Sequence, residues 1–237
     1  MDESKIKEFL IDLEKFIAKK INIDSSVENS INCCNMFDDN RMYEDEEKLL
    51  SLVLSSRNKS TSRKINTTTT VQGDSLEDLM KSLFGRVKFI DDVRITNRDL
   101  SIGQVDLQLT PIDDIAYKIL GLINDQPLGM IGECKNYAPS NKIKKEEIEK
   151  TCWRACKSGS LSFFLGQEFT SGSLKEIEDF NLHKSDICKK NSGVFIVPLN
   201  LEMIKSVIEK KINFCYFIKW AIHRSKSHNL TPYLRDS

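Results

Sequence analysis

The second half of this chain alternates short apolar runs with segments that repeat their apolar residues at helical spacing. Apolar runs of roughly four to eight residues, bounded by turn-forming residues, are typical of buried strands, whereas a 3.6-residue period is typical of helices. Strands that alternate with helices form parallel sheets, and two more strand-like runs precede this part of the chain. We therefore expect an α/β fold in which a mixed β-sheet is flanked by helices. The expected strands are 87–95, 103–112, 130–135, 161–165 and 194–197; the expected helices are 75–84, 144–157, 174–189 and two that begin near Leu201 and Phe214.

The first 57 residues differ from the rest in pattern and in charge. Apolar residues fall at helical spacing up to about Lys20, and a second helix is expected over 43–55. Residues 58–70 are rich in Ser and Thr and have no apolar periodicity. Up to Arg57 the chain has 8 Lys and Arg against 13 Asp and Glu, so this head is acidic and the remainder is modestly basic. We divide the chain into an acidic helical N-terminal region (1–57), a linker (58–72) and a main domain (73–237).

The N-terminal helix has an apolar stripe that includes Phe9, Leu13 and Phe16. An uncovered stripe of this kind promotes aggregation, so it has to pack on the main domain, on a second copy or on another protein. We expect this region to mediate homodimerisation or recruitment into a larger complex rather than to contact a substrate.

Composition is typical of an ordinary cytoplasmic protein. Hydrophobic residues make up 40% of 237 positions, and no apolar run approaches the ~18–20 residues of a membrane span. The chain starts Met1-Asp2-Glu3, acidic where a signal peptide is basic. Seven irregularly spaced Cys argue against a disulfide framework. Cys152 and Cys156 are read as core thiols rather than zinc ligands, and the three His as surface or satisfied residues.

One expected strand ends in charged residues, and the strand before it contains a single acid among apolar neighbours. The run from Met130 ends in Glu133-Cys134-Lys135, and side chains alternate along a strand, so Glu133 and Lys135 share one face. Asp106 lies in the preceding strand. If these strands are neighbours, two carboxylates and one ammonium converge, and Mg²⁺ binds such carboxylate oxygens while leaving room for phosphate and water. The alternative is an ordinary charged pair on a solvated strand, which Glu-x-Lys usually is.

These motifs resemble the PD-(D/E)xK, or restriction-endonuclease-like, nucleases, and especially the compact bacterial branch related to type IV restriction enzymes. The resemblance runs from about Gly73 to Phe214. Residues 73–79 resemble the opening helix of the family, with Glu77 at its acid position; Val105-Asp106 resembles the first motif, with Val in place of Pro; residues 131–136 resemble the second motif. Residues 161–165 and 169–172 resemble the strand and the Thr-containing turn that follow in this branch.

The resemblance implies a restriction-endonuclease-like nuclease domain at 73–237 and a Mg²⁺-dependent endodeoxyribonuclease, with Mn²⁺ as a substitute. Asp106, Glu133 and the backbone carbonyl of Cys134 would then bind metal. Lys135 would orient or help deprotonate the attacking water, and Glu77 would complete the site, although Asp74 or Asp78 could replace it. Such a protein acts on DNA, and we expect the nuclease effector of a bacterial defence system. Two alternatives remain open: a DNA-repair or junction-resolving nuclease, and a non-catalytic DNA-binding or assembly subunit of the same fold.

Overall fold

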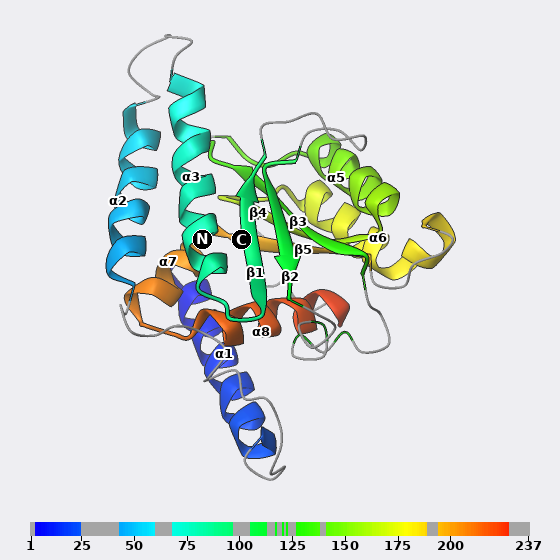
Figure 1. Ribbon diagram of the computed structural model, residues 1–237, viewed down its shortest axis with the longest axis horizontal. Helices are drawn as coiled ribbons and strands as arrows, with labels where there is room; N and C mark the ends of the chain where they lie inside the picture. The colour runs from blue at the N-terminus through cyan, green and yellow to red at the C-terminus, as the bar shows by residue number, and fades with distance from the viewer. Residues whose placement is uncertain are drawn as a thin grey trace.

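The computed structural model has an α/β architecture built on one five-stranded mixed sheet in the order β1-β2-β3-β4-β5, as expected (Figure 1). The structure describes residues 3–24, 43–59, 68–96, 105–112, 117, 120, 122, 127–137, 141–188 and 194–227; side chains 20–24, 57–59, 68–73 and 184–187 are not described. The strands are β1 (Ile90–Ile95), β2 (Leu107–Pro111), β3 (Gly129–Lys135), β4 (Ser160–Gly166) and β5 (Phe195–Asn200). The helices are α1 (Glu3–Asp24), α2 (Glu44–Lys59), α3 (Thr68–Gly85), α5 (Lys145–Ser158), α6 (Ser171–Ile187), α7 (Leu201–Glu209) and α8 (Phe214–Lys226).

The pairing of the strands follows from how they are connected. β1, β2 and β3 are antiparallel neighbours, whereas β3, β4 and β5 are parallel and are joined by α5 and α6. Every residue of β4 is buried, because helices cover both faces of this parallel part. β5 continues through Pro198 to Asn200, beyond the expected end at Val197; it lies at the edge of the sheet, where a proline need not donate to a neighbouring strand.

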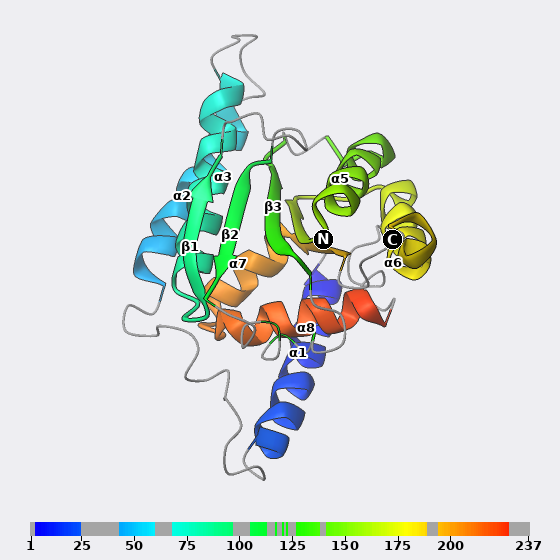
Figure 2. The same ribbon diagram turned by 45° about the vertical axis from the view of Figure 1, so that its right-hand side comes forward.

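Helices pack on both faces of the sheet. Phe163 of β4 contacts the rings of Phe84 in α3, whereas the next residue, Phe164, contacts Phe169 just before α6. Because successive side chains point to opposite faces, α3 lies on one face and the start of α6 on the other. Figure 2 shows the same division, with α5 and α6 on the side away from α2 and α3. None of the described helices is both long and apolar enough to cross a membrane.

Helix α1 packs on the C-terminal helices of the main domain. Phe9 and Leu13 are completely buried, and the ring of Phe9 lies 5.1 Å from that of Trp220 in α8. The indole N–H of Trp220 donates to Asp12 at 2.8 Å, and Arg224 pairs with the same carboxylate. The apolar stripe is therefore covered by the chain itself. This apolar stripe therefore does not require a second copy of the chain to cover it.

Helix α2 is tied to α3 by a buried ion pair. Glu46, 1% exposed, accepts a hydrogen bond from Ser82 at 2.6 Å and pairs with Arg86 at 2.9 Å. The Arg86 guanidinium also lies over the ring of Tyr43. α2 runs to Lys59 and α3 begins at Thr68, so both ends of the expected linker are helical, and its middle lies outside the described residues. Residues of both N-terminal helices belong to the same hydrophobic core as the sheet.

One expectation about the cysteines is wrong. Cys156 in α5 and Cys188 just after α6 form a disulfide, with Cα atoms 5.1 Å apart. Their separation of 32 residues gives no local signal, since only the packing of α5 against α6 brings them together. Cys134, Cys152 and Cys215 are buried and form no disulfide, so the expectation of a core thiol is confirmed for Cys152.

Candidate active site

The candidate site forms where β2 begins and β3 ends. In the antiparallel ladder Leu107 lies opposite Gly132, so the residue before β2, Asp106, lies opposite Glu133. Residues directly opposite each other project to the same face of a sheet. The Asp106 carboxylate also accepts a hydrogen bond at 2.7 Å from the backbone N–H of Cys134. This side-chain contact continues the ladder beyond the end of β2 and fixes the Asp106 carboxylate beside β3.

Lys135 joins the two expected carboxylates. Its Nζ lies 2.5 Å from Oε1 of Glu133 and 3.5 Å from Oδ2 of Asp106. Those two carboxylate oxygens are therefore at most about 6 Å apart, the sum of the two distances. To share one Mg²⁺ ion with ligands at about 2.1 Å, they would have to lie within about 4.2 Å of each other. The structure thus brings together Asp106, Glu133 and Lys135, the three residues that the sequence singled out.

Arg154 is a member of the site that sequence reasoning missed. It projects from α5, and its guanidinium contacts the second carboxylate oxygen of Glu133 at 2.9 Å. Glu133 therefore has a cation on each oxygen, Lys135 on one and Arg154 on the other. The available signal was weak: Arg154 follows the buried Thr151 by three positions on an amphipathic helix, at the border of its apolar face.

Glu77 approaches the cluster from α3 and is buried, whereas its neighbours Asp74 and Asp78 are exposed. This difference favours Glu77 among the three acids. Burial, together with the negative charge of Asp106, raises the pKa of Glu77 to about 7. Among the described side chains, Glu77 makes no hydrogen bond or ion pair with the other members. The charges of Asp106 and Lys135 nevertheless act on the pKa of Glu77.

The cluster carries more negative than positive charge when all its members are ionised, because three carboxylates face Lys135 and Arg154. Burial, and next the charge of Asp106, raises the pKa of Glu133 despite both cations. Burial alone would lower the pKa of Lys135, but the charges of Glu133 and Asp106 outweigh it and raise that pKa. Lys135 is therefore an ammonium, and burial is the main reason that the pKa values of Glu77 and Glu133 are raised.

The donor set fits a hard divalent cation by its chemistry. Glu77, Asp106 and Glu133 offer carboxylate oxygens, the ligands that Mg²⁺ prefers. The carbonyl of Cys134 lies on the same strand edge as its N–H, which faces Asp106. In the described part of the chain, however, no three His, Cys, Asp or Glu side chains are already arranged around one metal position. Lys135 stands between the two carboxylates instead.

Comparisons with protein-family models, with curated proteins and with solved structures give no match to this chain.

A prediction about stability follows from the raised pKa of Glu77. Between pH 4.5, its ordinary pKa, and about 7, the folded protein holds a proton that the unfolded chain has lost. The free energy of unfolding therefore falls as pH rises through this window. Above about pH 7 the folded protein bears the full cost of burying the ionised Glu77 carboxylate. Replacing Glu77 with Gln is expected to increase the free energy of unfolding by about 1–3 kcal/mol at pH 8, with the gain shrinking towards pH 4.5.

Urea unfolding of the wild type and Glu77→Gln at several pH values measures this difference. Asp78→Asn is the matched control, because it removes an exposed acid from the next position on the same helix. A gain that does not change with pH, or an equal gain in Asp78→Asn, would contradict this account of Glu77.

Proposed function

We propose that the protein is a metal-dependent DNA endonuclease that hydrolyses phosphodiester bonds. The observation that carries the proposal is the meeting of Asp106, Glu133 and Lys135 at the adjoining ends of β2 and β3, with Lys135 within 2.5 Å of one carboxylate and 3.5 Å of the other. The proposal also draws on the resemblance of these motifs to PD-(D/E)xK nucleases.

In this proposal Asp106, Glu133 and the Cys134 carbonyl hold Mg²⁺, or Mn²⁺ in its place, and Glu77 completes the set. The bound ion would neutralise charge on the phosphate and lower the pKa of its water. Lys135 orients the attacking water and stabilises the negative charge that develops on the phosphate, because its ammonium is fixed and partly desolvated. Arg154 holds Glu133 in place through the second carboxylate oxygen.

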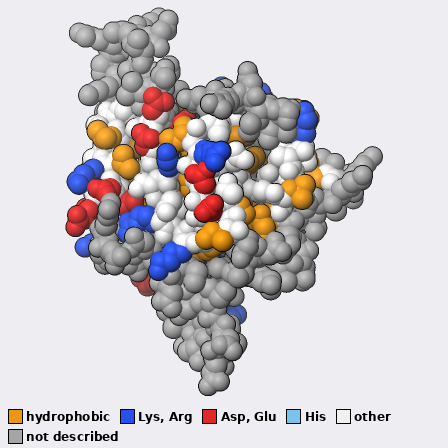
Figure 3. Space-filling view, in the orientation of Figure 1, with side chains coloured by type: hydrophobic (Ala, Val, Ile, Leu, Met, Phe, Trp, Pro, Cys, Tyr) orange, Lys and Arg blue, Asp and Glu red, His pale blue; other side chains and the backbone are white. Residues whose placement is uncertain are grey.

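The resemblance to the type IV restriction branch extends the proposal to the nuclease effector of a bacterial defence system acting in the cytoplasm. The charge of the surface adds little to this choice. On the face seen in Figure 3, Lys and Arg side chains are interspersed with Asp and Glu, so this face has no field of a single sign. The choice of DNA therefore depends on the site and on the resemblance.

Incubation of the purified protein with a panel of nucleic acids tests the substrate class. The panel contains supercoiled, linear, single-stranded and modified DNA, and an RNA of matched length, each with Mg²⁺ and with Mn²⁺. We expect cleavage of at least one DNA and slower or no cleavage of RNA. Cleavage of RNA alone would show that the substrate class is wrong.

A further inference from the structure

A cavity of about 500 Å³ opens beside the carboxylate cluster. It is lined by six residues, here called the lysine pocket: Tyr137, Asn141, Lys142, Lys144, Glu147 and Thr170. Tyr137 follows Lys135 by two positions, and the charges of Lys135 and Glu133 both act on its hydroxyl. The pocket and the candidate active site therefore adjoin each other at Tyr137.

The backbone holds the two lysines of the pocket in place. Ile143, between them, is buried and pairs with the segment around Phe169 through two backbone hydrogen bonds of 2.8 and 3.1 Å. Its side chain packs so closely on Gly166 that a Cβ there would lie 1.8 Å from Cδ1 of Ile143. Because side chains alternate along extended backbone, Lys142 and Lys144 project to the side opposite Ile143. They line the cavity together while Ile143 anchors them to the core.

The acidic groups near these lysines are already engaged. Glu147 accepts hydrogen bonds from the Tyr137 hydroxyl on one oxygen and from the Lys144 backbone N–H, at 2.9 Å, on the other. Glu168 lies 3.5 Å from Lys142, in a pair that remains partly exposed to solvent. The residues that precede α5 and α6, Lys144 and Thr170, both line the cavity, so the positive ends of two helix dipoles add to the two ammonium groups.

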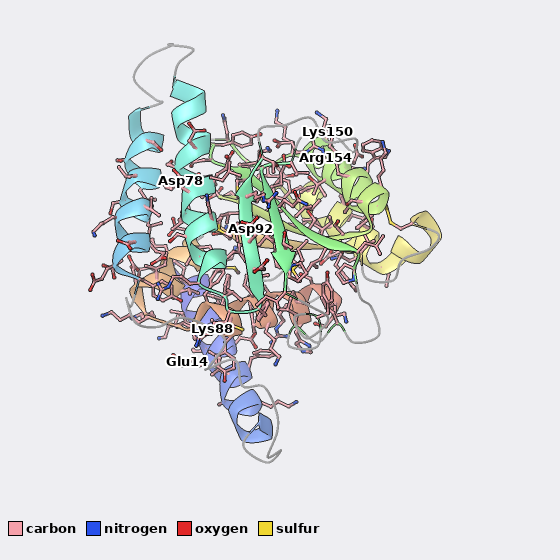
Figure 4. All side chains as sticks on the ribbon, in the orientation of Figure 1. Glu14, Asp78, Lys88, Asp92, Lys150 and Arg154 are labelled. Atoms are coloured by element: carbon pink, nitrogen blue, oxygen red, sulfur yellow. A yellow bond between two sulfur atoms is a disulfide. The ribbon has the colours of Figure 1, made fainter. Side chains whose placement is uncertain are left out.

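Helix α5 connects the pocket with the active site by a line of side chains. Glu147, Lys150 and Arg154 are three and four positions apart and therefore lie on one face of the helix. Glu147 lines the pocket and Arg154 contacts Glu133, which places Lys150 between them. Figure 4 shows Lys150 and Arg154 next to each other on α5. Lys150 is exposed and has no ion pair with any described side chain.

We propose that the lysine pocket binds a backbone phosphate of the DNA strand, adjacent to the phosphodiester that the carboxylate cluster cleaves. This inference rests on the proposed function and adds to it a defined contact with the substrate. Two lysine ammonium groups and two helix starts supply the donors and the positive charge for a second phosphate, and the carboxylates of Glu147 and Glu168 offset part of that charge. Lys150 guides the strand from the pocket to Arg154.

The test compares DNA binding by Lys142→Gln/Lys144→Gln with binding by the wild type. Fluorescence anisotropy of a labelled duplex in EDTA, over a range of salt concentrations, measures affinity without cleavage. We expect the double variant to bind about tenfold more weakly, since a partly exposed charged hydrogen bond contributes little more than that. The slope of log affinity against log salt should fall by about one, the value for one lost phosphate contact.

Lys88→Gln is the matched control, because Lys88 is exposed and lies well away from Lys150 in Figure 4. If the double variant is less stable than the wild type, Lys144→Gln alone replaces it, because this variant keeps the Lys142–Glu168 pair. It should also reduce the salt slope. If the double variant binds DNA with the affinity and salt slope of the wild type, and the wild type cleaves DNA, the lysine pocket does not bind a phosphate. The nuclease proposal would then still stand. An equal loss in Lys88→Gln would overturn the pocket proposal too.

Failure of the wild type to bind or cut any DNA would overturn both proposals. Binding of inorganic phosphate is tested separately, by isothermal titration calorimetry of the wild type and of the double variant. A response of the wild type to inorganic phosphate, with no binding of DNA, would identify a free phosphate ligand and contradict the assignment to a DNA strand.

Discussion

Replacement of Lys135 with alanine should slow DNA cleavage by about 10²- to 10³-fold, the loss expected when one fixed charge is removed from a developing oxyanion. The Lys135 ammonium contacts both Glu133 and Asp106, so it is positioned by the same carboxylates that would hold the metal. Single-turnover rates on a plasmid substrate give the direct measurement, since they separate the chemical step from product release.

The fold should survive this substitution. Arg154 still pairs with Glu133, and the Cys134 N–H still binds Asp106. Lys88→Ala provides the control, as an exposed lysine outside the site. Cleavage by Lys135→Ala at the wild-type rate, with a wild-type unfolding transition, would remove Lys135 from the chemistry.

Deletion of residues 1–57 should prevent folding of the remaining chain. The deletion removes Phe9, Leu13 and Val53, all completely buried, and uncovers the faces of α8 and α3 on which they pack. It also removes Glu46, which leaves Arg86 without its buried partner; breaking such a pair alone costs about 3–5 kcal/mol. Each of the three buried side chains adds about 2–5 kcal/mol, so the loss is comparable with the roughly 5–15 kcal/mol by which domains are stable.

Circular dichroism and urea unfolding of the truncated chain test this expectation. Phe9→Ala is the milder companion variant, and it should lower the free energy of unfolding by about 3–5 kcal/mol. A truncated protein that unfolds cooperatively at the wild-type midpoint would show that the N-terminal helices form a separate unit after all.

The sequence predicted the parts of the structure that depend on local pattern. The alternation of apolar runs and helices predicted the order of β3, α5, β4, α6 and β5, because each element shows its own periodicity. It also predicted the meeting of Asp106 with Glu133, because two strands joined along the chain tend to pair. The alternation of side chains then placed Lys135 on the same face as Glu133.

Contacts between distant segments could not be predicted in this way. Arg154 reaches Glu133 only because of the angle at which α5 crosses β3, and no periodicity encodes that angle. The same holds for Glu46, whose partner Arg86 lies 40 residues away, and for Cys156 and Cys188. The apolar stripe of α1 was recognised correctly, but its pattern could not reveal which surface covers it.

In the proposed function, a divalent cation held by Asp106 and Glu133 is needed to cut DNA. The most direct measurement follows one reaction of the purified protein with supercoiled plasmid, first in EDTA and then after addition of Mg²⁺ in excess of the chelator. We expect intact plasmid in EDTA and nicked or linear DNA after Mg²⁺ is added, and Lys135→Ala should form neither product in the time that the wild type needs to cut most of the plasmid. Cleavage in EDTA, or an intact plasmid with both Mg²⁺ and Mn²⁺ across the whole DNA panel, would contradict it.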